Sequence, residues 1–147
     1  MTENVPLPDF DLSRFMPYRL AVAAQRTSEE LARQYRDRFG ISIPEWRVLV
    51  HLATAEDVSV RDIEARVAME KSKVSRAATR LEAQGYVTKT QHQGDRRLVR
   101  LKLTPRGREL MAELLPLAQA YQDEIEARLG AAFAHLESGL TALLQDK

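Results

Sequence analysis

Six polar residues between positions 72 and 80 combine hydroxyl groups with long cationic side chains, and no acidic residue lies among them. They are Ser72, Lys73, Ser75, Arg76, Thr79 and Arg80. At about 100° per residue of an α-helix, they lie away from an apolar face formed by Val74, Ala77, Ala78 and Leu81. Arginine and lysine donate to guanine, and hydroxyl groups serve several base edges. The pattern therefore predicts a helix that reads the major groove of duplex DNA, and a solvated helix face is the alternative.

Within this predicted reading helix, the residues nearest the N-terminus are expected to reach deepest into the groove. We assign base edges to Ser72, Lys73, Ser75 and Arg76. Thr79 and Arg80 are expected to contact the DNA backbone instead.

A second cationic group, Asp95-Arg96-Arg97, lies at the tip of a predicted β-hairpin. Arginine side chains are attracted by the negative potential of a narrow minor groove. Asp95 can orient the guanidinium of Arg97 through a bidentate pair. The group predicts a minor-groove contact, and a solubilising loop is the alternative.

Charge is distributed unevenly along the chain. Residues 59–109 hold 13 Lys/Arg against 6 Asp/Glu, whereas the rest holds 9 against 15, and the net charge is +1. This split predicts a polyanionic partner for the middle of the chain. Four further residues of this region are predicted to contact DNA phosphates: Ser59, Arg61, Lys71 and Lys89.

Hydrophobic periodicity and capping residues predict the helices and strands that carry these cationic groups. We predict an arm at residues 1–10 and a helix at 12–39, in which Pro17 can interrupt the first turn and after which Gly40 follows as a stop. A buried second helix opens at Ser42, and a third runs from an N-cap at Ser59 to about Val67. A turn at Ala68 and Met69 precedes the reading helix at 70–84. Strands at 87–91 and 98–103, a long helix after Thr104 and a last helix after Gly130 complete the prediction.

The predicted fold class is mostly α with a small β-hairpin wing. Three regions are expected: an arm and dimerisation helix at residues 1–40, a winged helix-turn-helix DNA-binding domain at 41–103, and dimerisation helices at 104–147.

Several classes of function are not expected. The chain has no cysteine, and its three histidines show no ligand spacing, so neither a metal nor a cofactor is predicted. No phosphate-binding glycine loop, nucleophile elbow or paired histidine motif predicts an enzyme. No apolar run reaches the roughly 20 residues of a membrane span, and no signal pattern opens the chain, so we expect a cytoplasmic protein.

The stretch from residue 59 to residue 110 resembles the MarR family of winged helix-turn-helix regulators. The most specific marks are KSKVSRAATRLEAQGYV, the Asp95-x-Arg97 wing and LTPRGREL, and the earlier ISIPEWRVLVHLA resembles the family's second helix. The resemblance covers roughly residues 41–110. It implies a homodimer on a pseudo-palindromic operator, and repression that a small ligand relieves.

The resemblance also implies that the first and last helices form the dimer interface. Eight apolar residues are predicted there: Phe15, Leu20, Leu117, Tyr121, Ile125, Phe133, Leu136 and Leu140. The end helices carry more apolar residues than one small domain covers, which also favours a dimer. An intramolecular helical bundle is the alternative.

The family's ligand cleft lies between the dimer helices and the winged domain. In this chain the facing segments predict five effector-binding residues: Tyr18, Arg19, Arg26, Trp46 and His51. Arginine beside aromatic rings suits an aromatic carboxylate or its CoA thioester. Trp46 and His51 also fit roles in the core, and Arg19 fits an ion pair across a dimer. Two other functions remain open: an effector-independent architectural DNA-binding protein, and a protein-interaction module that has lost DNA binding.

Overall fold

The computed structural model describes residues 4–55, 58–67, 69, 71–92 and 94–145, which are mostly helical. A 3-10 turn, η1, precedes two α-helices, and a short strand with two further helices leads to a β-hairpin and two last helices. The bounds are η1 Leu12–Arg14, α1 Met16–Phe39, α2 Ile43–Thr54, β1 Val58–Ser59, α3 Val60–Val67, α4 Lys71–Ala83, β2 Val87–His92, β3 Asp95–Leu103, α5 Pro105–Leu129 and α6 Ala132–Leu144. The predicted fold class is confirmed.

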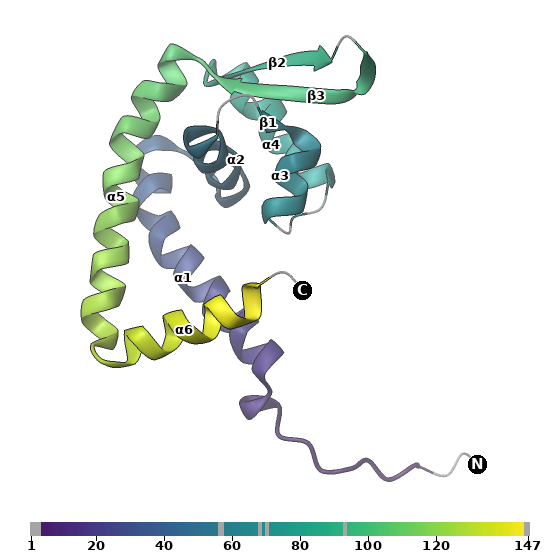
Figure 1. The fold of residues 1–147 in the computed structure, drawn as a ribbon, viewed down its shortest axis with the longest axis vertical. Helices are drawn as coiled ribbons and strands as arrows, with labels where there is room; N and C mark the ends of the chain where they lie inside the picture. The colour runs from purple at the N-terminus through teal and green to yellow at the C-terminus, as the bar shows by residue number, and fades with distance from the viewer. Residues whose placement is uncertain (1–3, 56–57, 68, 70, 93, 146–147) are drawn as a thin grey trace.

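Figure 1 shows a winged part at one end of the molecule and long helices that extend away from it. Helices α2, α3 and α4 gather with the sheet at one end, while α5 leads away from them beside α1. Helix α6 turns back at the far end of α5, and the N-terminal arm extends away from the body. The predicted turn and start of the reading helix involve Ala68 and Glu70, which lie outside the described residues.

The predicted helix at residues 12–39 is interrupted at its start, where Pro17 was predicted to break the first turn. Asp11 caps the short η1 turn by accepting from the Ser13 backbone N–H at 3.1 Å, and α1 begins only at Met16. Pro17 lies in the first turn of α1. A proline ring clashes with the carbonyl four residues earlier, here that of Ser13, so a continuous helix cannot extend backwards through this position.

The predicted capping residues hold the helix starts. At α2, the Ser42 hydroxyl accepts from the Glu45 backbone N–H and the Glu45 carboxylate accepts from the Ser42 N–H, both at 3.3 Å. At α3, Ser59 and Asp62 exchange the same two bonds at 3.1 and 3.4 Å. These bonds to Ser59 hold the pKa of Asp62 below its ordinary value. Each pair of reciprocal hydrogen bonds satisfies two backbone N–H groups that have no acceptor within the helix.

The sheet has one strand more than the predicted hairpin. Its order is β1-β3-β2, all antiparallel, and Val58 and Ser59 pair with Leu101 and Arg100 of β3. A segment of two residues is too short to show the alternation of apolar and polar residues that identifies a strand in a sequence. The extra strand ties the start of α3 to the hairpin.

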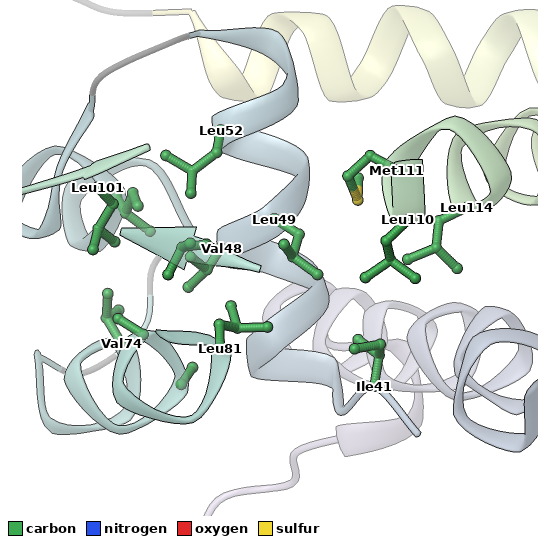
Figure 2. Close-up of a cluster of buried hydrophobic side chains, with 14 of the residues drawn as sticks. Ile41, Val48, Leu49, Leu52, Val74, Leu81, Leu101, Leu110, Met111 and Leu114 are labelled. Carbon is green, nitrogen blue, oxygen red and sulfur yellow. The ribbon is translucent and has the colours of Figure 1, made fainter. Parts of the chain in front are cut away.

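One hydrophobic core joins helices α1 to α5 with strands β2 and β3. Figure 2 shows Val48 and Leu49 of α2 at its centre, between Leu81 of α4, Leu101 of β3 and Leu114 of α5. The predicted apolar face of the reading helix is confirmed, because its four residues are fully buried: Val74, Ala77, Ala78 and Leu81. Burial of one side of α4 forces its polar side outward.

The junction between α4, the hairpin and α5 is tightly fixed. Gly85 ends α4 with a left-handed φ of 83°. The Thr104 hydroxyl donates to the Gly85 carbonyl at 2.5 Å and accepts from the Gly107 N–H at 3.0 Å, so the predicted cap of α5 also holds the end of α4. A Cβ on Gly107 would lie 2.1 Å from the Tyr86 carbonyl oxygen. Only glycine fits at position 107.

Candidate nucleic-acid interface

The polar face of α4 points away from the core. Lys71, Ser72, Lys73, Arg76, Thr79 and Arg80 are exposed, and Ser75 is half-buried. No acidic residue lies between positions 71 and 81. The structure therefore brings all six predicted reading residues to one outward surface, which we call the α4 face.

Hydrogen bonds order three side chains of the α4 face. Arg76 donates from Nε to the Ser72 carbonyl at 3.3 Å, which leaves its two terminal nitrogens available. Thr79 donates from Oγ1 to the Ser75 carbonyl at 2.9 Å. Lys89 of β2 donates from Nζ to the same Thr79 oxygen at 2.7 Å. The last contact joins the hairpin to the α4 face.

A hollow of about 360 Å³ opens on the α4 face. Its lining residues are Ser75, Arg76, Thr79 and Arg80. The two guanidinium groups of the hollow can donate to phosphate oxygens or to the acceptor edge of a guanine. The hollow holds no acid, so it favours an anionic partner.

The hairpin carries the predicted wing residues beside this surface. β3 begins at Asp95, directly after the turn, and Asp95 pairs with His92 across the hairpin. The side chains of Asp95, Arg96 and Arg97 lie outside what the structure describes, and Gln93 is not among the described residues. Their minor-groove role stays a prediction.

The four predicted phosphate contacts have different surroundings. Arg61 and Lys71 are exposed, and Lys89 is half-buried. Ser59 is only 6% exposed, and its hydroxyl accepts from the Asp62 backbone N–H. Ser59 therefore serves the start of α3, and we leave it out of the DNA contacts proposed below.

The predicted effector residues do not form one site. Tyr18, Arg19 and Arg26 line a cavity of about 560 Å³ between α1 and the end of α5. Trp46 instead stacks on Tyr35, with ring centroids 5.4 Å apart. His51 donates from Nδ1 to the carbonyl of Arg47 at 2.8 Å, so it belongs to α2 itself.

A second cavity, which the sequence did not reveal, lies between the N-terminal helix and the winged part. It measures about 340 Å³ and takes residues from α1, α2 and α4, among them Ser28, Arg47 and Lys73. Arg47 donates to the Ser28 hydroxyl at 3.5 Å. Lys73 therefore belongs both to the α4 face and to this cavity.

The predicted dimer residues form a partly exposed surface. Phe15, Leu136 and Leu140 are 43%, 44% and 37% exposed, and no described residue of α6 is buried. The remaining interface residues except Tyr121 are half-buried: Leu20, Leu117, Ile125 and Phe133. Exposed apolar surface of this extent suits a protein partner better than water.

Tyr121 differs from the other predicted interface residues because its own chain buries it. Its hydroxyl donates to the Glu30 carboxylate at 3.1 Å, and Arg128 donates to the same carboxylate at 3.0 Å. The Arg128 hydrogen bond holds the pKa of Glu30 below its ordinary value, whereas burial raises the pKa of Tyr121. This trio fixes α1 against α5.

The described residues provide neither a metal-binding cluster nor a membrane-spanning helix. No group of three His, Cys, Asp or Glu side chains is placed to hold a metal ion. None of the described helices combines the length and the apolar character that crossing a bilayer requires.

Comparisons with known proteins point in one direction. Residues 39–98 match the model of the MarR family. An uncharacterized HTH-type transcriptional regulator of Bacillus cereus is 26% identical over 95 residues, which are 65% of this chain and 63% of that protein. The match thus spans less than two thirds of this relative's length.

Solved structures share the fold over nearly the whole chain. A MarR family transcriptional regulator from Silicibacter pomeroyi is 28% identical with a TM-score of 0.77, over 92% of this chain and 97% of that chain. BpsR of Bordetella bronchiseptica, whose DNA binding is regulated by 6-hydroxynicotinic acid, is 24% identical with a TM-score of 0.78. That match covers 95% of this chain and 99% of the other, and it concerns the fold alone.

Proposed function

Because the chain belongs to the MarR family of winged helix-turn-helix transcriptional regulators, we propose that it binds specific operator DNA and represses transcription as a homodimer. The α4 face carries this proposal: exposed Lys73, Arg76 and Arg80 beside hydroxyl groups, with no acid among them. Relatives in the family are transcriptional regulators rather than enzymes, which agrees with the absence of predicted catalytic motifs.

The proposed roles follow the three predicted regions. Residues 41–103 bind DNA, whereas residues 1–40 and 104–147 pair with the second subunit. Ser72, Lys73, Ser75 and Arg76 reach base edges, and Arg61, Lys71, Arg80 and Lys89 contact phosphates. Asp95, Arg96 and Arg97 of the wing enter the minor groove.

Upstream DNA from the protein's own operon is expected to bind at least about a thousandfold more tightly than a shuffled duplex. The logarithm of the affinity is expected to fall with log salt by about 0.9 for each phosphate contacted. Fluorescence anisotropy at several salt concentrations measures both quantities. Equal affinity for both duplexes would favour an architectural protein, and no binding at low salt would favour a protein-interaction module; either result contradicts the proposal.

The homodimer is supported by the exposed apolar surface of α1 and α6. Leu140→Glu places a carboxylate on this surface and is expected to convert the dimer to a monomer, because burying an unpaired charge is costly. Sedimentation velocity compares it with Ala112→Glu, the same added charge at an exposed position of α5 near the winged end. A wild-type protein that sediments as a monomer contradicts the homodimer.

The proposed function also includes release of the protein from its operator DNA when a small ligand binds. An aromatic carboxylate would bind the cavity whose charged lining residues are Arg47, Lys73 and Glu29, because two cations face one acid there and a ligand contacts both α2 and the reading helix. Thermal-shift titration with aromatic acids and acyl-CoA thioesters tests this role. A ligand that stabilises the protein but leaves operator affinity unchanged contradicts it.

A further inference from the structure

We infer that Thr79 is a positioning residue that holds Lys89 of the hairpin against the reading helix, so that Lys89 binds a DNA phosphate together with the α4 face. The inference rests on the proposed DNA-binding function and deepens it. It changes the predicted role of Thr79 from a direct DNA contact to an indirect one.

The hydrogen bonds of Thr79 support this role. A threonine hydroxyl has one proton and two acceptor lone pairs. In this structure, Thr79 donates its proton to the Ser75 carbonyl at 2.9 Å, and its oxygen accepts from Lys89 at 2.7 Å. Phosphate oxygens only accept hydrogen bonds, so Thr79 has no proton to offer them while this arrangement persists.

Lys89 can donate hydrogen bonds to a phosphate, which Thr79 cannot do. An ammonium group has three donors, and the contact with Thr79 uses one of them. The other two remain for the oxygens of a phosphate. Thr79 lines the hollow together with Arg76 and Arg80, and the Lys89 ammonium lies 2.7 Å from the Thr79 hydroxyl oxygen. The two guanidinium groups of the hollow and this ammonium can bind one backbone phosphate together.

The position of Lys89 on β2 explains why it needs a partner. Lys89 pairs with Leu101 in the hairpin, so its backbone belongs to the wing rather than to α4. A free lysine side chain samples many rotamers, and ordering it on binding costs entropy. The Thr79 hydroxyl orders the lysine before DNA arrives. Wing and reading helix thereby present one continuous cationic surface.

A double-mutant cycle tests the inference with Thr79→Val, Lys89→Gln and the two combined, all as full chains. Valine keeps the shape of threonine and removes the hydroxyl. Thr79→Val is expected to weaken operator binding about three- to tenfold, the usual range for one hydrogen bond. Lys89→Gln is expected to reduce the salt slope by about 0.9. In the Lys89→Gln protein, Thr79→Val is expected to change affinity less than twofold, because the two residues act as one unit.

Two variants separate positioning from general damage. Thr79→Ser keeps the hydroxyl and is expected to bind like the wild type. Thr90→Val removes an exposed hydroxyl of β2 and is expected to leave affinity and salt slope unchanged. Melting temperatures of all variants report whether each folds normally.

The possible outcomes are distinct. Wild-type affinity of Thr79→Val overturns the inference, as does an equal effect of Thr79→Val with and without Lys89. An unchanged salt slope in Lys89→Gln also overturns it. In each of these cases wild-type operator binding survives, and so does the proposed function. A wild type that binds no DNA instead removes the proposed function, and the inference falls with it.

Discussion

Arg76→Ala is expected to weaken operator binding by about 1–3 kcal/mol and to abolish the preference for one base pair in each half-site. Arg76 is exposed near the middle of α4, with Ala77 and Ala78 buried behind it. Its Nε donates to the Ser72 carbonyl, which leaves the two terminal nitrogens available. Those two nitrogens match the O6 and N7 acceptors of guanine.

Binding of Arg76→Ala to operators with every single-base change measures this effect. Arg33→Ala is the matched control, because Arg33 is also exposed but lies on α1, away from the α4 face. The control is expected to keep both affinity and base preference. If Arg76→Ala discriminates among the altered operators as the wild type does, then Arg76 does not read a base.

Gly107→Ala is expected to lower the free energy of unfolding by about 1–3 kcal/mol or more, and to lower operator affinity as well. The added Cβ would lie 2.1 Å from the Tyr86 carbonyl oxygen, a backbone atom that cannot move by a rotamer change. That carbonyl also accepts from the Thr104 N–H at 3.0 Å. Relief of the clash must therefore separate the start of α5 from the junction between α4 and the hairpin.

Urea unfolding followed by circular dichroism measures the loss of stability. Gly139→Ala is the control, because a Cβ at position 139 of α6 meets no atom within 4 Å. Alanine is about 0.5–1 kcal/mol more favourable than glycine inside a helix, so the control is expected to be as stable as the wild type or more stable. Equal unfolding midpoints for the two variants would show that the junction tolerates a side chain.

Local chemistry explains why much of the fold could be predicted from the sequence. Ser42 and Ser59 each have an acid three residues later, and both pairs form the reciprocal bonds of a helix start. Gly40 and Gly130 follow the last turns of α1 and α5 with positive φ. The inner and outer faces of α4 follow directly from helical periodicity.

Features that depend on contacts distant in sequence were not predictable. Strand β1 exists only because Val58 meets Leu101, more than 40 residues away. The burial of Tyr121 depends on Glu30 of another helix. The predicted effector residues were grouped because aromatic and cationic side chains suit an aromatic carboxylate. In the fold, Trp46 stacks on Tyr35, whereas Arg26 lines a separate cavity.

The cavity beside Lys73 was missed for a related reason. All of its lining residues except Met69 come from three helices. Among them, Lys73 was predicted to read DNA, and Arg47 had no predicted role. No spacing in the sequence connects them, because only the packing of α1 and α4 against α2 brings them together. Sequence reasoning predicted the outward polar face of α4, whereas the structure was needed to locate neighbouring cavities.

Hydroxyl-radical footprinting of the wild-type protein on its upstream DNA tests the central claim most directly. A dimer that presents two α4 faces to one duplex is expected to protect two tracts on the same side of the DNA, centred about one helical turn, or roughly 34 Å, apart. A single protected tract, or uniform protection without a boundary, would contradict the claim.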